Sequence, residues 1–141
     1  MFTAININSR YAYAYYGKNK ETTTILKFLN QFKKDSKEIH NITADSGSEF
    51  TKKQCTQWFQ ENNIKLFFVV GDSHKLGIIN RFHRTLKEKI LKYFIASETT
   101  RWIDVIDRII KNYNYNTINR TIYDVHQLRK AIILYIYNLL L

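Results

Sequence analysis

The chain has 141 residues and a net charge of +10, from 22 lysines and arginines against 12 acidic residues. Apolar residues make up 45% of it, which excludes a disordered tail and allows one domain with a hydrophobic core. The basic excess favours a polyanion partner, usually nucleic acid, although an AT-rich genome would also enrich Lys, Asn, Ile and Tyr. Cys55 is the single cysteine, which excludes an internal disulfide, and no apolar run is long enough to span a membrane. We therefore expect an intracellular protein with no membrane partner.

The pattern of apolar residues predicts a mixed α/β domain. Alternation predicts strands at residues 2–7 and 11–16, joined by a short turn into a hairpin. The pattern then predicts, in chain order, a helix at 22–34, a strand at 39–44, a helix at 51–61, a strand at 64–70, and helices at 76–95 and 100–116. The strand at 64–70 is apolar except for Lys65, so we expect it to be covered on both faces. Residues 1–125 are expected to form the main domain, and residues 126–141 an apolar C-terminal helix that needs a partner surface.

Polar residues stand at the ends of two of these expected elements. Asp45 closes the strand at 39–44 and precedes a Ser-Gly-Ser turn, so its carboxylate is expected at an exposed strand end. Asn80, Arg84 and Lys87 recur at helical spacing near the start of the helix at 76–95, away from its apolar face. The sequence thus predicts one acid, one amide and two cations around one corner of the domain.

The two motifs resemble those of a known enzyme family. Residues 45–50 read DSGSEF, and residues 77–87 read GIINRFHRTLK. The catalytic cores of retroviral and retrotransposon integrases, including those of self-synthesising DNA transposons, carry D-N/S-G-x-E-F at a strand end and G-x-x-E-R-x-N/H-R-T-L-K on a later helix. Either motif alone is a weak signal, but two long motifs at the family's separation are a strong one. The resemblance covers residues 1–125 and implies an RNase H-like fold, in which helices flank a mixed sheet.

The chain departs from the family pattern at two of the three catalytic carboxylates. The third carboxylate of the family, a glutamate, falls on Asn80. The first belongs to a strand that precedes the match to residues 2–7 and is central to the family's sheet. Either another segment fills that place or the protein extends upstream of Met1, and the sequence leaves both open. By resemblance, Asp45 is then the remaining catalytic acid and metal ligand, and Asn80 stands at a catalytic position.

The resemblance also implies a metal cofactor, Mg²⁺ or Mn²⁺. Integrase chemistry uses a pair of these cations held by three carboxylates, because hard cations prefer anionic oxygen ligands. Asn80 offers a neutral amide oxygen, so we expect no productive metal binding in this chain. Glu49 and Asp72 are acids that could reach the site, but a surface or helix-entry role is favoured for Glu49 and a solvated loop position for Asp72.

Four residues are expected to bind DNA. Arg84 and Lys87 match cations that touch the DNA end in the family, and His74 and Lys75 lie in the loop that approaches DNA. Cations on a solvent-facing stripe are often generic, so the motif match is what favours phosphate contact. His83 matches a variable family position and is expected to be structural.

Three hypotheses for function fit these features. The first is an integrase-like nucleic-acid-binding domain from a mobile element or virus, ancestrally a DNA-integrating polynucleotidyl transferase and now catalytically inactive. It would lie in the nucleus of a eukaryotic host. The second is a fragment of an active integrase with upstream residues missing, which Asn80 argues against. The third is an exapted structural or oligomerisation module, because integrase cores dimerise through helices. DNA and a second copy of the chain are the expected partners.

Overall fold

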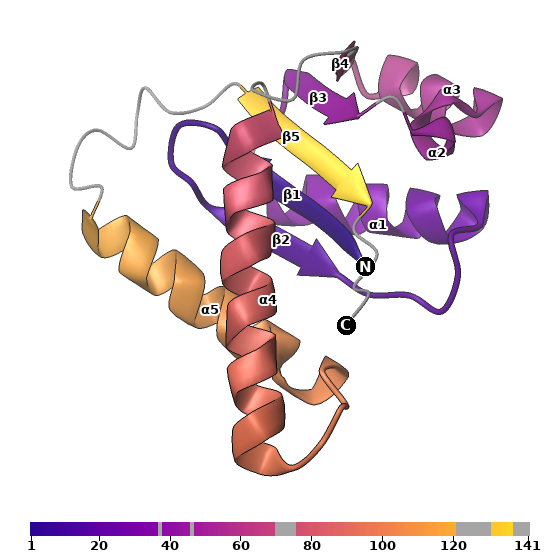
Figure 1. Cartoon of the computed structure of the whole chain (residues 1–141). Coiled ribbons are helices and arrows are strands. Elements are labelled where there is room, and N and C mark those ends of the chain that lie inside the picture. The colour runs from indigo at the N-terminus through magenta and orange to yellow at the C-terminus, as the bar shows by residue number, and fades with distance from the viewer. Residues whose placement is uncertain (37, 46, 70–75, 121–130, 137–141) are drawn as a thin grey trace.

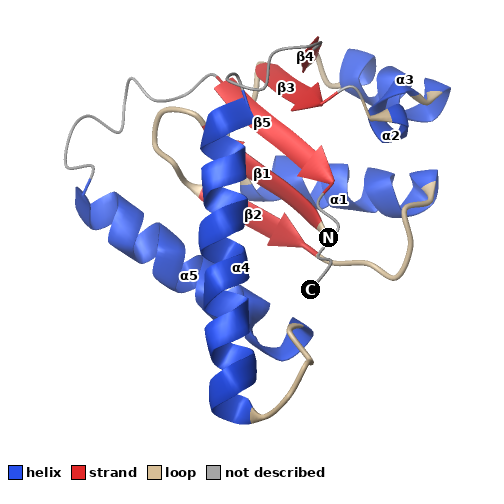
Figure 2. Cartoon of the chain, in the orientation of Figure 1, coloured by secondary structure: helices blue, strands red, loops and turns tan. Residues whose placement is uncertain are grey.

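The computed structural model describes residues 1–36, 38–45, 47–69, 76–120 and 131–136, which form one five-stranded sheet with helices on both faces (Figures 1 and 2). The elements follow in chain order: β1 Phe2–Asn6, β2 Ala12–Tyr15, α1 Thr22–Asp35, β3 Asn41–Asp45, α2 Ser48–Thr51, α3 Lys53–Glu61, β4 Lys65–Val69, α4 Gly77–Ser97, α5 Ile103–Arg120 and β5 Ala131–Ile136. Most elements agree with the sequence prediction. The predicted helix at 51–61 corresponds to α3, and a short helix that was not predicted, α2, precedes it across the extended backbone of Lys52.

The strand order in the sheet is β2-β1-β5-β3-β4. β1 pairs with β2 in antiparallel fashion, as the predicted hairpin requires, and β3 pairs with β4 in parallel. β5 lies between the two pairs, antiparallel to β1 and parallel to β3. Figure 1 shows this last strand running through the middle of the sheet, beside elements formed by the N-terminal half of the chain.

β5 corrects the prediction for the C-terminal segment. A helix was expected over residues 126–141, but Ala131–Ile136 is a strand. The expectation was wrong over these residues because helical spacing cannot distinguish a short apolar run in a helix from one in a central strand. The backbone of β1 and of β3 needs hydrogen-bond partners in the middle of the sheet, and β5 supplies them on both sides. Residues 121–130 and 137–141 lie outside the described part of the chain.

Two hydrophobic cores lie on the two faces of the sheet; β1 contributes side chains to both, and β3 contributes to one. On one face, Phe2, Ala4, Ile42 and Ala44 pack with α1, α2 and α3 in a core that includes Leu29, Phe32, Phe50, Cys55 and Phe59. On the other face, Ile5 packs with α4 and α5 in a core that includes Ile79, Phe82, Leu86, Ile90 and Ile106. Figure 1 shows α4 and α5 on the near side of the sheet. The result is three layers with the sheet in the middle.

The strand β4 differs from the prediction in its exposure. It stands at the edge of the sheet, and the side chains of Phe67 and Phe68 are 51% and 38% exposed. The expectation that this apolar run is covered on both faces is therefore wrong within the described part of the chain. The run of apolar residues indicated a strand correctly, but its place in the sheet depends on partners far away in the sequence.

Candidate functional site

Asp45 is the last residue of β3, as the first motif predicts. Ile42 and Ala44 face the core beneath α1, so alternation directs Asp45 and Thr43 to the opposite face of the sheet, which α4 and α5 cover. Partial burial raises the pKa of the Asp45 carboxyl, a hydrogen bond from the Gly47 N–H lowers it, and the charge of Glu49 raises it again, with a net increase. Asp45 is therefore a partly buried carboxylate at the strand end.

Glu49 is the second carboxylate near Asp45, and Lys20 neutralises part of its charge. The Glu49 Oε1 atom lies 3.2 Å from Lys20 Nζ. A Cβ on Gly47 would stand 2.5 Å from Glu49 Oε2 and 3.2 Å from Asp45 Oδ1, so both carboxylates lie close to the Gly47 backbone. Burial raises the pKa of Glu49, but hydrogen bonds from its own N–H and from Lys20 outweigh burial and lower it overall. Glu49 is thus already partnered by a cation.

Asn80, Arg84 and Lys87 lie on α4 at the spacing that the second motif predicts. Asn80 and Arg84 are exposed, and Lys87 is half-buried. Ile79, Phe82, His83 and Leu86 form the buried side of the same helix. Among the residues that the structure describes, no hydrogen bond or ion pair joins Asn80 to Asp45. The three polar residues share one side of α4, but no direct contact links them to the acid.

Three other residues of the sequence analysis, Asp72, His74 and Lys75, lie outside the described residues. His83 is described and is structural as expected: its Nε2 atom lies 2.8 Å from Thr3 Oγ1, and burial lowers the pKa of its imidazole to about 4. Cys55 is fully buried in the core, as predicted.

The acids in the described part of the chain do not by themselves fit a pair of divalent metal ions. No cluster of three or more His, Cys, Asp or Glu side chains suited to a metal occurs in the described part of the chain. Asp45 is one carboxylate, Glu49 is held by Lys20, and Asn80 has no charge. β5, at the central position of the sheet, contributes six residues, AIILYI, and none of them is an acid. The described residues alone would therefore not supply the anionic ligands that two hard cations need.

A basic cavity on the other side of α4 was not predicted from the sequence. It is lined by Arg10 on the turn between β1 and β2, and by Arg81 and Lys89 on α4. The spacing of Arg81, Thr85 and Lys89 would have indicated a polar stripe, but nothing in the sequence places Arg10 beside it. Lys20 was missed in the same way, because no local signal links it to Glu49, 29 residues away.

Comparison with known proteins gives two relatives in sequence. The chain is 28% identical over 123 residues to a transposon-derived protein of Caenorhabditis elegans, and this match covers 86% of the chain and 42% of that protein. It is 28% identical over 88 residues to the Pro-Pol polyprotein of feline foamy virus, covering 62% of the chain and 8% of the polyprotein. The chain thus spans less than half the length of both relatives. No family model matches the chain.

Solved structures give the same result at the level of the fold. The HTLV-2 integrase catalytic core domain in complex with magnesium, in a dimeric form, superposes with a TM-score of 0.63 at 14% identity, over 77% of this chain and 68% of that one. The catalytic core domain of BIV integrase superposes with a TM-score of 0.65 at 16% identity, over 77% of this chain and 70% of that one. None of the helices in the described ranges is both long and apolar enough to cross a membrane. The prediction from the two motifs is confirmed: the chain has the fold of retroviral integrase catalytic cores and is similar in sequence to transposon-derived and retroviral Pol proteins.

Proposed function

We propose that this chain is a nucleic-acid-binding, catalytically inactive integrase-like domain of a mobile element or virus. The observation that carries the proposal is the position of β5. It lies beside β3 at the centre of the sheet, where the family's first strand brings a catalytic aspartate, and it has no acidic residue. In a eukaryotic host the domain would act on DNA in the nucleus.

The chemistry of strand transfer requires more negative charge than this site offers. In a two-metal mechanism one cation activates the attacking hydroxyl and the other stabilises the leaving oxygen, and carboxylates hold both. Asp45 alone cannot offset the mutual repulsion of two divalent cations. Asn80 is neutral, and Lys20 competes with any metal for Glu49 at 3.2 Å. These features support binding without metal-dependent catalysis.

Arg84 and Lys87 support the binding part of the proposal. They lie on the motif helix α4, in an arrangement that can meet successive phosphates of a DNA strand, and neither forms an ion pair with a described carboxylate. A protein that neutralises phosphates releases counterions, so each contact contributes about −0.9 to the slope of log affinity against log salt. His74 and Lys75 of the preceding loop complete the proposed DNA-binding set.

A salt titration of DNA binding tests this proposal. We expect the chain to bind a fluorescein-labelled duplex of unrelated sequence, with fluorescence anisotropy as the readout. The Arg84→Gln/Lys87→Gln variant should bind more weakly and lose up to about 2 units of slope. The Lys27→Gln/Lys34→Gln variant removes equal charge from the exposed side of α1 and is the matched control. Absence of binding at low salt would overturn the proposal.

A cleavage assay tests the inactivity. We expect no Mg²⁺- or Mn²⁺-dependent end processing or strand transfer by this chain, and no rescue by Asn80→Glu alone, because β5, the strand beside β3, would still carry no acid. The comparison is with Asp45→Ala, purified in the same way. Metal-dependent cleavage that disappears in this variant would instead support the second hypothesis, in which the chain is part of an active integrase. That hypothesis is supported by the coverage of the relatives: the chain matches 42% of the transposon-derived protein and 8% of the Pro-Pol polyprotein.

We also propose that the chain forms a homo-oligomer. Self-association would also fit the hypothesis of a structural or oligomerisation module. The HTLV-2 cores that it resembles in fold were solved in dimeric and trimeric forms. Light scattering measures the mass in solution directly. A monomer at all concentrations would contradict this part, and DNA binding by the monomer would leave the first hypothesis intact.

A further inference from the structure

A cavity of about 720 Å³ opens between α4, α5 and the turn from β1 to β2, and we call it the α4–α5 cavity. Its described lining consists of Arg10, Gly77, Ile78, Arg81, Phe82, Thr85, Lys89, Tyr113, Asn116 and Thr117. The volume is within the range, about 300 to 1,000 Å³, of pockets that hold small ligands. Of the described residues proposed above for DNA binding, neither Arg84 nor Lys87 belongs to this lining.

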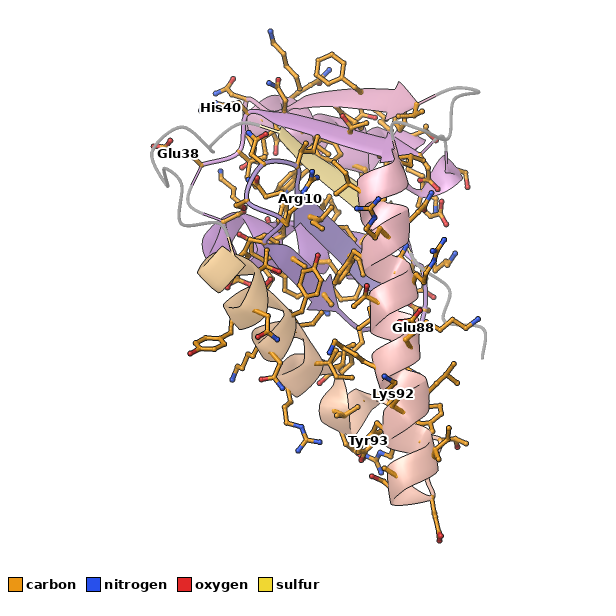
Figure 3. All side chains as sticks on the ribbon, turned by 60° about the vertical axis from the view of Figure 1, so that its left-hand side comes forward. Arg10, Glu38, His40, Glu88, Lys92 and Tyr93 are labelled. Atoms are coloured by element: carbon orange, nitrogen blue, oxygen red, sulfur yellow. The ribbon has the colours of Figure 1, made fainter. Side chains whose placement is uncertain are left out.

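The α4–α5 cavity is positively charged. Arg10, Arg81 and Lys89 are its charged residues, and its described lining contains no acid. None of the three forms an ion pair with a carboxylate in the described part of the chain. Arg10 lies on the turn beside α4 (Figure 3), and it lines the same cavity as the two cations on α4. Three cations converging without an acid favour an anionic ligand.

Arg10 is held in place by its own turn. The Asn6 side chain accepts hydrogen bonds of 2.9 Å from the N–H groups of Asn8 and Ser9, and the Arg10 N–H donates to the Asn6 carbonyl at 2.9 Å. Arg10 adopts the left-handed conformation, with φ of 59°. This conformation is uncommon for a residue with a side chain and persists only where the surroundings enforce it. The guanidinium thus projects from an ordered turn.

The wall formed by α5 is also fixed. Asn114 Oδ1 accepts from the Ala12 N–H and its Nδ2 donates to the Ala12 carbonyl, both at 2.8 Å, which ties α5 to the start of β2. The ring of Tyr113 packs edge-on against Phe82 at 5.0 Å between centroids, which ties α5 to α4. A ligand would therefore enter a pre-formed site and would pay little ordering entropy.

We propose that the α4–α5 cavity binds the phosphate groups of a nucleic-acid strand, at a second place separate from Arg84 and Lys87. Arginine binds carboxylates and phosphates through its fork of N–H donors, and phosphates are the anions that a nucleic-acid strand presents. Arg81 and Lys89 are two helical turns apart with Thr85 between them, so they line α4 in a row that can follow a backbone. The inference rests on the proposed DNA binding and adds a second contact region, on the α5 side of the same helix.

The test compares two variants of equal charge, with the same fluorescein-labelled duplex and a labelled single strand as probes. Arg10→Gln/Arg81→Gln/Lys89→Gln replaces the three charged side chains of the described cavity lining by neutral ones. Lys27→Gln/Lys34→Gln/Lys53→Gln removes three exposed cations from α1 and α3, which pack on the opposite face of the sheet. We expect the cavity variant to bind at least about tenfold more weakly at low salt and to lose about 2 to 3 units of slope. The control variant should retain most of the affinity at low salt and most of the salt slope.

Other outcomes separate this inference from the function on which it rests. If the cavity variant and the control change binding equally, only net charge matters and the cavity site is refuted. If Arg84→Gln/Lys87→Gln weakens binding and the cavity variant does not, DNA binding stands and the second site falls. Arg81→Gln alone, at an exposed position, guards against a folding defect and should show a slope loss of about 1 unit. Amide chemical shifts of Arg10 and Arg81 that stay unchanged on addition of the single strand would also overturn the inference.

Discussion

Thr3 and His83 share a buried hydrogen bond of 2.8 Å that joins β1 to α4. Thr3 is fully buried and His83 is 5% exposed, so the imidazole is held away from water. Burial lowers the pKa of His83 to about 4 from its usual 6.5. The motif helix is therefore linked to the sheet by a histidine whose neutral form is favoured at neutral pH.

The free energy of unfolding should consequently fall in mild acid. The folded-state pKa is below the unfolded one, so this contribution is complete above pH 6.5 and is lost as the pH falls towards 4. The loss should be on the order of 3 kcal/mol. Urea unfolding at a series of pH values measures it. His83→Gln keeps a hydrogen-bonding side chain that does not titrate, so this variant should lose less stability between pH 6.5 and pH 4. Identical pH profiles for the native chain and the variant would show that His83 is not the titrating group.

Removal of the Asn114 side chain should destabilise the fold. In the native protein the Ala12 N–H donates to the Asn114 side chain and the Ala12 carbonyl accepts from it, both at 2.8 Å and both buried. Asn114→Ala leaves these two backbone groups without their partners. An unsatisfied buried group costs about 1 to 3 kcal/mol, so we expect a decrease of about 2 to 5 kcal/mol in the free energy of unfolding. Chemical denaturation gives the value. Asn112→Ala, at an exposed position on the same helix, is the control and should change stability by less than about 0.5 kcal/mol.

A proline in β5 should destabilise the sheet strongly. Residue 133 pairs with Ile5 on one side and with Thr43 on the other, so its backbone is inside the sheet. Ile133→Pro removes the N–H and should cost about 3 kcal/mol or more. Ile133→Val keeps the N–H and a β-branched side chain, so it is the control and should cost much less than the proline. Equal melting temperatures for the two variants would show that β5 does not hold the centre of the sheet in solution.

Lys20 should set the acidity of both carboxylates near Gly47. Its charge lowers the pKa of Glu49 and of Asp45. Lys20→Met should therefore raise both pKa values, and Glu49→Gln should lower that of Asp45. Carboxyl carbon shifts followed by NMR across a pH titration report each residue separately. Lys27→Met, on α1, is the control and should move neither; an unchanged pKa of Glu49 in Lys20→Met would mean that the 3.2 Å ion pair is not formed in solution.

The sequence by itself determined the class of fold and the position of the two motifs. Alternation in residues 2–7 and 11–16 and the three- and four-residue steps of α4 are local patterns, because they depend on the geometry of a single strand or helix. DSGSEF and GIINRFHRTLK placed Asp45 at a strand end and Asn80 near a helix start, as the structure has them. The neutral asparagine at position 80 is likewise read from the sequence alone.

The tertiary structure decided what fills the centre of the sheet and which charges meet. The apolar run at 131–136 is compatible with a helix or a strand, and pairing with both β1 and β3 makes it a strand. In the same way Lys20 reaches Glu49, and Arg10 reaches the α4–α5 cavity, through contacts between residues far apart in the chain. Local periodicity does not contain such contacts, since they arise only when separate elements pack together. That packing places Asp45 at the end of β3 and gives α4 a basic surface beside α5.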